Sequence, residues 1–206
     1  TYYFGVDSNN IGAYLGYFKK YERDKLYNTD IIKSLQNYYS EELMVNILNR
    51  CNSDFISRMQ YLDINTYLVD DILTKVDRAS MANSLEVRVP LLDHNFVELI
   101  CQIPSKYKID NYNQKLIFKN AVSGLVPKKI IQAKKKGFGI PLSKWFKEDL
   151  KEYVNESLSS KNSKIFNFLD FESVKNLIEY NNKGYRDYSQ KLWSLINLEE
   201  WLKQNY

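Results

Sequence analysis

Residues 63–93 hold the side chains whose types could do chemistry. An adjacent acidic pair, Asp70 and Asp71, is followed by the cations Lys75 and Arg78, and a further carboxylate, Glu86, comes soon after. Aspartates can hold Mg²⁺ against phosphate oxygens, and Lys and Arg can neutralise the charge that develops on a phosphoryl group during transfer. The combination is compatible with chemistry on a nucleotide or another phosphate.

The same side chains also fit ordinary surface ion pairs. Asp71 and Lys75 stand four residues apart, which is the spacing of neighbours on one helix face, and Glu86 could pair with Arg88 across an extended segment. Residue type and spacing leave both interpretations open.

The net charge of +4 is unevenly spread, because five lysines fall in the stretch KKIIQAKKK at residues 128–136. Such a cluster can bind phosphate or nucleic acid, or simply face solvent. Aromatic residues do not interleave with these lysines, so no nucleic-acid partner is expected.

Cysteine and histidine usage narrows the chemistry further. Cys51 and Cys101 lack metal-ligand spacing and are predicted to be reduced thiols of a cytoplasmic protein. His94 is the only histidine, which argues against a multi-histidine metal site. No run of about 18 apolar residues and no signal-peptide pattern occurs, so no membrane partner or export is expected.

The elements that position these residues are predicted to be helices. Only seven Gly and four Pro interrupt the chain, apolar residues recur at three- and four-residue spacing, and no convincing sheet is found. Asp93 suits a helix N-cap, and Gly124 suits a helix stop. Helices are expected near residues 28–38, 43–48, 55–62, 68–83, 93–101, 115–122 and 188–202.

The predicted helix at 68–83 carries an apolar stripe on one face and a polar face opposite it, which bears Asp70 and Arg78. The stripe consists of Leu68, Ile72, Val76 and Ala79. The next segment, residues 85–90, alternates instead, which places Glu86 and Arg88 on the same side of an extended stretch.

Longer motifs in the chain resemble those of the asparagine synthetases. The signature segment of that family is similar, almost throughout, to residues 66–94, TYLVDDILTKVDRASMANSLEVRVPLLDH. The resemblance continues in KLIFKNAVSGLVPKKII, in KKKGFGIPLSKWF and in the closing LWSLINLEEW. These matches span roughly residues 60–205, and the first quarter of the chain is poorly covered.

The resemblance implies a fold class and an activity. The fold would be mainly α, the helical lobe of an adenine-nucleotide α-hydrolase-like (ATP pyrophosphatase) synthetase domain, occupying residues 1–206. In that family ATP adenylates the side-chain carboxylate of aspartate, with Mg²⁺ bound. Ammonia from a glutaminase domain, released from glutamine, then displaces AMP.

The resemblance also implies roles for single residues. Glu86 would sit beside the acyl-adenylate as the base or orienter of the amination step. Lys135, two residues before Gly137, would stabilise negative charge on the phosphates. Ala133 stands where the family usually has an arginine, which puts one supporting contact in doubt.

The remaining implied contacts concern ATP and magnesium. Asp71, or its neighbour Asp70, would help to place the magnesium-pyrophosphate unit. Arg78 would tie its helix to the wall of the active site. Lys115 matches a lysine of the family helix in that region, although a solvated helix lysine is an equal alternative.

The ATP loop of the family is Ser-Gly-Gly-x-Asp-Ser after a buried strand. Only Phe4-Gly5-Val6-Asp7-Ser8 is weakly similar to it. Gly16-Tyr17 is a remnant at best of another family stretch, and Thr1 stands where glutamine hydrolysis would need a cysteine. The chain is therefore interpreted as a fragment that is inactive alone.

Two alternatives to an asparagine synthetase stay open. One is a related amidotransferase that activates another carboxylate by the same adenylation. The other is a non-catalytic helical interaction module, which the 17 tyrosines could serve as surface aromatics. A homodimer is compatible with every one of these interpretations.

Overall fold

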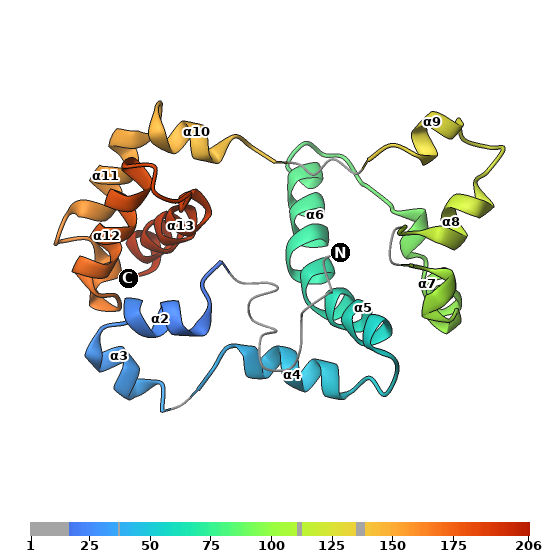
Figure 1. The fold of residues 1–206 in the computed structure, drawn as a ribbon, viewed down its shortest axis with the longest axis horizontal. Helices are drawn as coiled ribbons and strands as arrows, with labels where there is room; N and C mark the ends of the chain where they lie inside the picture. The colour runs from blue at the N-terminus through green and yellow to red at the C-terminus, as the bar shows by residue number, and fades with distance from the viewer. Residues whose placement is uncertain (1–16, 37, 111–112, 135–138) are drawn as a thin grey trace. The chain divides into compact units, whose positions relative to one another are not determined.

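A computed structural model describes residues 17–206 of the chain, except 37, 111–112 and 135–138. Helices dominate this part, no strand occurs among the described residues, and backbone pairing outside helices is limited there to isolated bridges (Figure 1). The mainly α prediction is confirmed. In the part of the chain that the structure describes, no helix is long and apolar enough to cross a membrane.

The described residues divide into two compact units. The C-terminal unit comprises residues 17–41 and 139–206, and the central unit comprises residues 42–134. Each unit is described by itself below.

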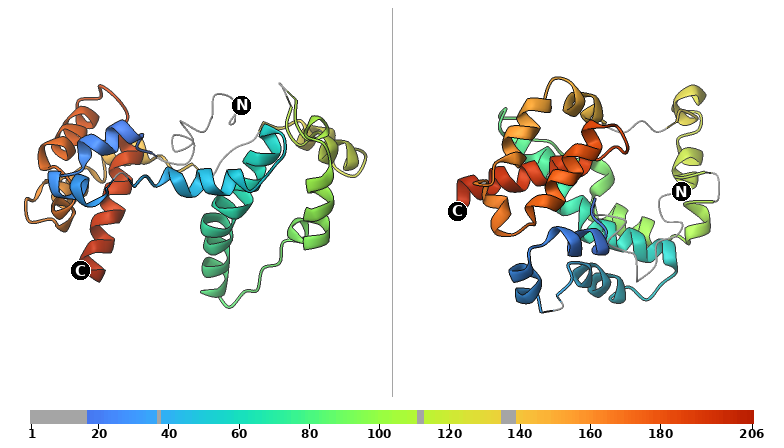
Figure 2. Two further views of the ribbon diagram at one scale, coloured as in Figure 1. Left: turned by 90° about the horizontal axis from the view of Figure 1, so that it is seen from below. Right: turned by 60° about the vertical axis from the view of Figure 1, so that its left-hand side comes forward.

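The C-terminal unit is a helical bundle (Figures 1 and 2). Its helices are α2 (Lys20–Leu26), α3 (Thr29–Ser34), α10 (Leu142–Lys147), α11 (Lys151–Ser159), the 3₁₀ turn η4 (Lys164–Asn167), α12 (Phe171–Asn182) and α13 (Ser189–Asn205). Their apolar faces meet in one core made of Leu26, Leu142, Phe146, Val154, Leu158, Ile165, Leu169, Val174, Ile178, Leu192, Leu195, Ile196 and Leu202. Burial of this many large side chains is the main source of stability in the unit.

The early helices α2 and α3 belong to this bundle although more than 100 residues separate them from the rest of it. The backbone N–H of Asn28 donates to Phe168 O at 3.0 Å, and the N–H of Asp170 donates to Leu26 O at 2.7 Å. Asn28 also caps α3, since its side chain accepts from the Ile31 N–H. Backbone pairing of this kind fixes the register between the two segments.

One ion pair strengthens the same attachment, and a second joins α2 to the first residue of the helix that follows α3. Lys191 on α13 reaches Glu22 on α2 at 2.5 Å, with both side chains mostly shielded from solvent, and Arg23 pairs with Glu41. Burial by itself would raise the pKa of the Glu22 carboxyl. Hydrogen bonds from the Lys191 ammonium and from the Lys19 backbone N–H outweigh burial, so the pKa of Glu22 lies below its ordinary value.

The central unit contains the segment with the candidate functional residues. Its elements are α4 (Glu41–Asn49), α5 (Phe55–Asn65), the π-helix η1 (Tyr67–Leu73), α6 (Thr74–Met81), the 3₁₀ turn η2 (Pro90–Leu92), α7 (His94–Gln102), the 3₁₀ turn η3 (Ser105–Tyr107), α8 (Leu116–Ala121) and α9 (Lys128–Ile131). Asp93 caps α7 as predicted, accepting from the Asn95 and Phe96 N–H groups. Gly124 has a φ of 91°, a left-handed conformation that suits glycine at a helix stop.

The central unit buries much less apolar surface than the C-terminal unit. Of its described apolar residues, those that are buried are Ile47, Leu48, Met59 and Leu62. The predicted stripe on residues 68–79 is covered only in part by the described chain, since Leu68 and Ile72 are half-buried whereas Val76 and Ala79 are exposed. The C-terminal half of the amphipathic pattern therefore has no packing partner among the described residues.

Candidate functional site

The helix predicted at residues 68–83 is not a uniform α-helix. Residues Tyr67–Leu73 are π-helical, and α-geometry begins only at Thr74. The Thr74 hydroxyl donates to the Val69 carbonyl oxygen, five residues back, at 2.9 Å. Since a π-turn holds more residues than an α-turn, the π-segment rotates Asp70 and Asp71 relative to the polar face of α6. The expectation of a single regular face was wrong for this reason.

Asp70 and Asp71 lie on the exposed surface of η1. Asp71 pairs with Lys75 at 3.3 Å. This is the ordinary surface ion pair that the four-residue spacing predicted as the alternative to a role in phosphate chemistry. Among the described residues no three Asp, Glu, His or Cys side chains group as metal ligands do. Mg²⁺ often binds through one or two carboxylates together with substrate phosphates. Each of the two exposed aspartates could supply a single carboxylate to such an ion, with the remaining ligands coming from elsewhere.

A tight turn at the end of α6 sets the direction of the following segment. The Ser84 N–H donates to Met81 O at 2.9 Å, and the Leu85 N–H donates to Ser80 O at 3.0 Å, which together form a Schellman motif. Ser84 has a φ of 55°, in the left-handed region that favours glycine. This turn was not predicted from the sequence, because the polar pair Asn83-Ser84 at the helix end is only a weak signal for it.

Glu86 follows this turn in an extended, exposed segment. Both Nε and one terminal nitrogen of Arg88 lie near a single oxygen of Glu86, Oε1, at 2.7 Å and 2.6 Å. The two side chains are 67% and 86% exposed, so the pair contributes little to stability. The other oxygen, Oε2, accepts no hydrogen bond from a described residue. Within the described chain, one carboxylate oxygen of Glu86 is therefore bound by an arginine and the other has no donor.

The sequence predicts three cationic residues at the site, Arg78, Lys115 and Lys135, of which the structure describes the first two. Arg78 is exposed on α6, and its guanidinium forms no hydrogen bond or ion pair with a described residue, so the predicted tie to a site wall is not formed within the described chain. Lys115 is exposed at the N-cap of α8, one residue before the helix expected to include it, with a φ of 60°. Lys135 lies outside the described residues, as do the Gly5 and Gly16 motifs.

The segment around Glu86 exposes apolar side chains as well as charges. Leu85, Val87, Val89 and Leu91 alternate with the charged residues and are all exposed. An extended segment that shows its apolar side and its backbone to solvent is typical of a surface that another part of a protein covers. Asp70, Asp71, Arg78 and Glu86 thus follow one another along η1, α6 and the extended segment after it, all on the exposed surface of the described chain.

Comparison with known sequences gives the family. A sequence model of the asparagine synthase family matches residues 13–203. The chain is 31% identical over 183 residues to asparagine synthetase [glutamine-hydrolyzing] 1 of Bacillus subtilis, covering 86% of this chain and 29% of that protein. It is 32% identical over 149 residues to a putative asparagine synthetase [glutamine-hydrolyzing] of Mycobacterium tuberculosis, covering 72% of this chain and 22% of that protein.

The fold and these similarities define a helical part of an ATP-dependent ligase family. The chain belongs to the asparagine synthase family. It spans less than a third of the length of the curated relatives that it matches.

More distant similarities reach proteins with another name. Amidase chry2 of Gibberella zeae is 24% identical over 141 residues, covering 65% of this chain and 21% of that protein. No solved structure matches the chain.

Proposed function

We propose that the chain is part of an asparagine synthase that activates the side-chain carboxylate of aspartate with ATP and converts it to an amide with ammonia derived from glutamine. The observation that carries the proposal is the family match, which runs from residue 13 to residue 203 and so includes the whole region around Glu86. The names of the relatives give the same activity for those proteins.

The chemistry has two steps with different demands. In the first, a carboxylate oxygen of aspartate attacks the α-phosphorus of ATP and pyrophosphate leaves. Arg78, Lys115 and Lys135 are proposed to neutralise the phosphate charge. Asp71, with Asp70, is proposed to hold the magnesium ion against pyrophosphate, and this ion would supply further charge neutralisation.

In the second step the nitrogen of ammonia attacks the acyl carbon, the bond to AMP breaks, and a proton leaves the nitrogen. Glu86 is proposed to accept that proton or to orient the ammonia. Its free Oε2 supports this role, because an oxygen without a donor can receive a proton. Arg88, bound to Oε1, would help to orient the carboxylate.

The Glu86→Gln variant tests the proposal in the natural full-length protein. Glutamine keeps the size of the side chain but cannot accept the proton. We expect asparagine formation to fall by about 100-fold or more, the usual contribution of a general base. Aspartate-dependent exchange of pyrophosphate into ATP, which reports the first step alone, should persist.

Two control variants separate catalysis from structure. Glu98→Gln changes another exposed glutamate, on α7, and should leave both activities intact. Arg88→Gln removes the ion-pair partner, and its loss should be much smaller than that of Glu86→Gln. Equal losses for the two members of the pair would mean that Glu86 acts only through its ion pair. Unchanged amide synthesis in Glu86→Gln would favour the non-catalytic interaction module.

The 206-residue chain by itself is proposed to be inactive. Its described residues present the candidate groups on an open surface, and the only echo of an ATP loop lies in residues 4–8. Incubation with ATP, aspartate and Mg²⁺ should release no pyrophosphate, and measurable turnover would contradict this expectation.

A second candidate is amide formation on a different carboxylate. The weaker similarity to two proteins named amidases supports this candidate, because relatives of the chain carry names other than asparagine synthetase. Pyrophosphate exchange by the full-length protein with a panel of carboxylates separates the two, since an asparagine synthase should respond to aspartate above all others.

A further inference from the structure

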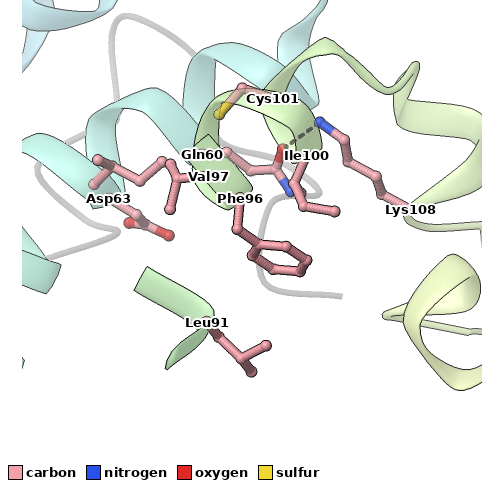
Figure 3. Close-up of a pocket in the computed structure, with 9 residues that line it drawn as sticks. Gln60, Asp63, Leu91, Phe96, Val97, Ile100, Cys101 and Lys108 are labelled. Atoms are coloured by element: carbon pink, nitrogen blue, oxygen red, sulfur yellow. Dashed lines mark hydrogen bonds between the residues drawn. The ribbon is translucent and has the colours of Figure 1, made fainter. Parts of the chain in front are cut away.

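The central unit contains a pocket whose lining includes none of the proposed catalytic or ATP-binding residues. It is formed between α5 and α7, near the η2 turn and the end of η3, and has a volume of about 270 Å³. Figure 3 shows its lining, which consists of Gln60, Asp63, Ile64, Leu91, Phe96, Val97, Ile100, Cys101 and Lys108. Most of this surface is hydrocarbon, and the size suits a small organic molecule.

The unusual member of the lining is Lys108, which is only 7% exposed. Lysine is almost never buried this far unless its charge is paired. Its ammonium donates to Gln60 Oε1 at the long distance of 3.4 Å, and no described carboxylate forms an ion pair with it (Figure 3). A neutral acceptor at that distance compensates poorly for taking a cation out of water.

The fold holds Lys108 in this position through its neighbours. The hydroxyl of Ser105 donates to the two carboxylate oxygens of Asp54 at 2.8 Å and 3.0 Å, and the same carboxylate caps the start of α5. The Lys108 N–H then donates to Ser105 O at 2.9 Å. The end of η3 is therefore tied to the helix that carries Gln60, and the ammonium is positioned before any ligand arrives.

The charges of the lining limit what can bind. Asp63, the other charged residue, lies across the pocket from Lys108 in Figure 3. Lys108 is the only cation among the described residues of the lining, so a ligand can pair one negative charge with it, whereas a second negative charge would meet no cation there. The pocket thus favours a single anionic group attached to an apolar body.

We infer that this pocket binds a small apolar monocarboxylate. Its carboxylate accepts a charge-assisted hydrogen bond from the Lys108 ammonium, and its hydrocarbon part packs on Phe96, Val97 and Ile100. None of these residues takes part in the proposed asparagine synthesis, so the two proposals can be tested independently of each other.

The direct test compares an acid with its neutral amide on the natural full-length protein. By titration calorimetry, 4-phenylbutyrate should bind with a Kd in the millimolar range or tighter, as expected for a ligand of its size. The isosteric 4-phenylbutyramide should bind at least about tenfold more weakly, because it lacks the charge. Adipate, with two carboxylates, should not bind detectably under the same conditions.

Two lysine variants assign the effect to one side chain. Lys108→Met keeps the apolar stem and should remove the preference for the acid over the amide. This variant should fold, since replacing a buried ionic group by an apolar one is often neutral or stabilising. Lys106→Met changes an exposed lysine two residues away and should leave the preference intact.

A chemical readout needs no variant. Cys101 lines the pocket and Cys51 does not, and both thiols are free. Saturating 4-phenylbutyrate should slow alkylation of Cys101 by N-ethylmaleimide at least about threefold, a clear difference for a ligand that excludes the reagent, and should leave the rate at Cys51 unchanged.

The proposal is wrong if the acid and the amide bind equally, if Lys108→Met retains the preference, or if neither compound binds. In the last case, a Cys101 that resists alkylation in the ligand-free full-length protein would show that another segment of the protein fills the pocket.

Discussion

We expect the Glu199→Gln substitution to lower the free energy of unfolding of the C-terminal unit strongly, although it only replaces one carboxylate oxygen by an amide nitrogen. Glu199 lies on α13 and is 1% exposed. One of its oxygens accepts from the Lys164 N–H at 3.2 Å and the other from the Ile165 N–H at 2.8 Å. The carboxylate therefore satisfies two backbone donors at the start of η4, which have no partner within the turn.

The magnitude follows from these two contacts. Glutamine has one acceptor oxygen, and its amide nitrogen would set a donor against one of the two N–H groups. One charge-assisted hydrogen bond becomes a neutral one, and one buried N–H loses its acceptor, which together cost about 2–3 kcal/mol in the free energy of unfolding. The 3.8 Å ion pair of Glu199 with the half-exposed Lys203 adds little.

The chain offers a matched control and a selective probe. Glu200→Gln changes the next residue, which pairs with the same Lys203 at 2.9 Å on the surface, and should cost less than about 0.5 kcal/mol. The three tryptophans, at positions 145, 193 and 201, all lie in the C-terminal unit. Tryptophan fluorescence during urea unfolding therefore reports on this unit. Equal urea midpoints for the two variants would refute the capping role of Glu199.

Two further predictions concern the central turn and the attachment of α2. Ser84→Gly should raise the free energy of unfolding of the central unit by about 0.4–1 kcal/mol, because glycine adopts a φ of 55° without strain. This gain is measured by chemical denaturation followed by hydrogen exchange in α6. A destabilised variant would contradict the prediction. The pKa of Glu22 is lower in the folded than in the unfolded chain, so the stabilisation from its pair with Lys191 is full above the ordinary value of 4.5 and is lost as the pH falls below it. When the pH is lowered from 7 to 4, the urea midpoint should therefore fall further in the natural sequence than in Lys191→Met. Equal falls in the two proteins would show that this pair does not contribute.

Much of the secondary structure could be predicted from local patterns. Apolar spacing located α5 and α13, and Asn28 and Asp93 marked helix starts, because capping and amphipathic periodicity are properties of short stretches of chain. The alternation at residues 85–90 foresaw that Glu86 and Arg88 share a side, and they do pair. The family, too, was readable from motifs and agrees with the comparisons.

Features that depend on other parts of the chain could not be read in this way. The π-geometry of η1 and the left-handed Ser84 change which way Asp70, Asp71 and Glu86 face, and neither has a firm local signature. Whether Glu86 and Lys135 meet in one cleft stays a prediction, since Lys135 lies outside the described residues.

The sequence by itself determined that this chain is helical, where several of its helices begin, and to which family it belongs, because these follow from side-chain periodicity, caps and extended motifs. Only the tertiary structure decided which apolar faces are buried. It packed Leu26 of α2 into the C-terminal core, left Val76 and Ala79 of the predicted stripe exposed, and buried Lys108 against Gln60. Burial depends on segments that meet from distant places in the chain, and no local pattern specifies that meeting.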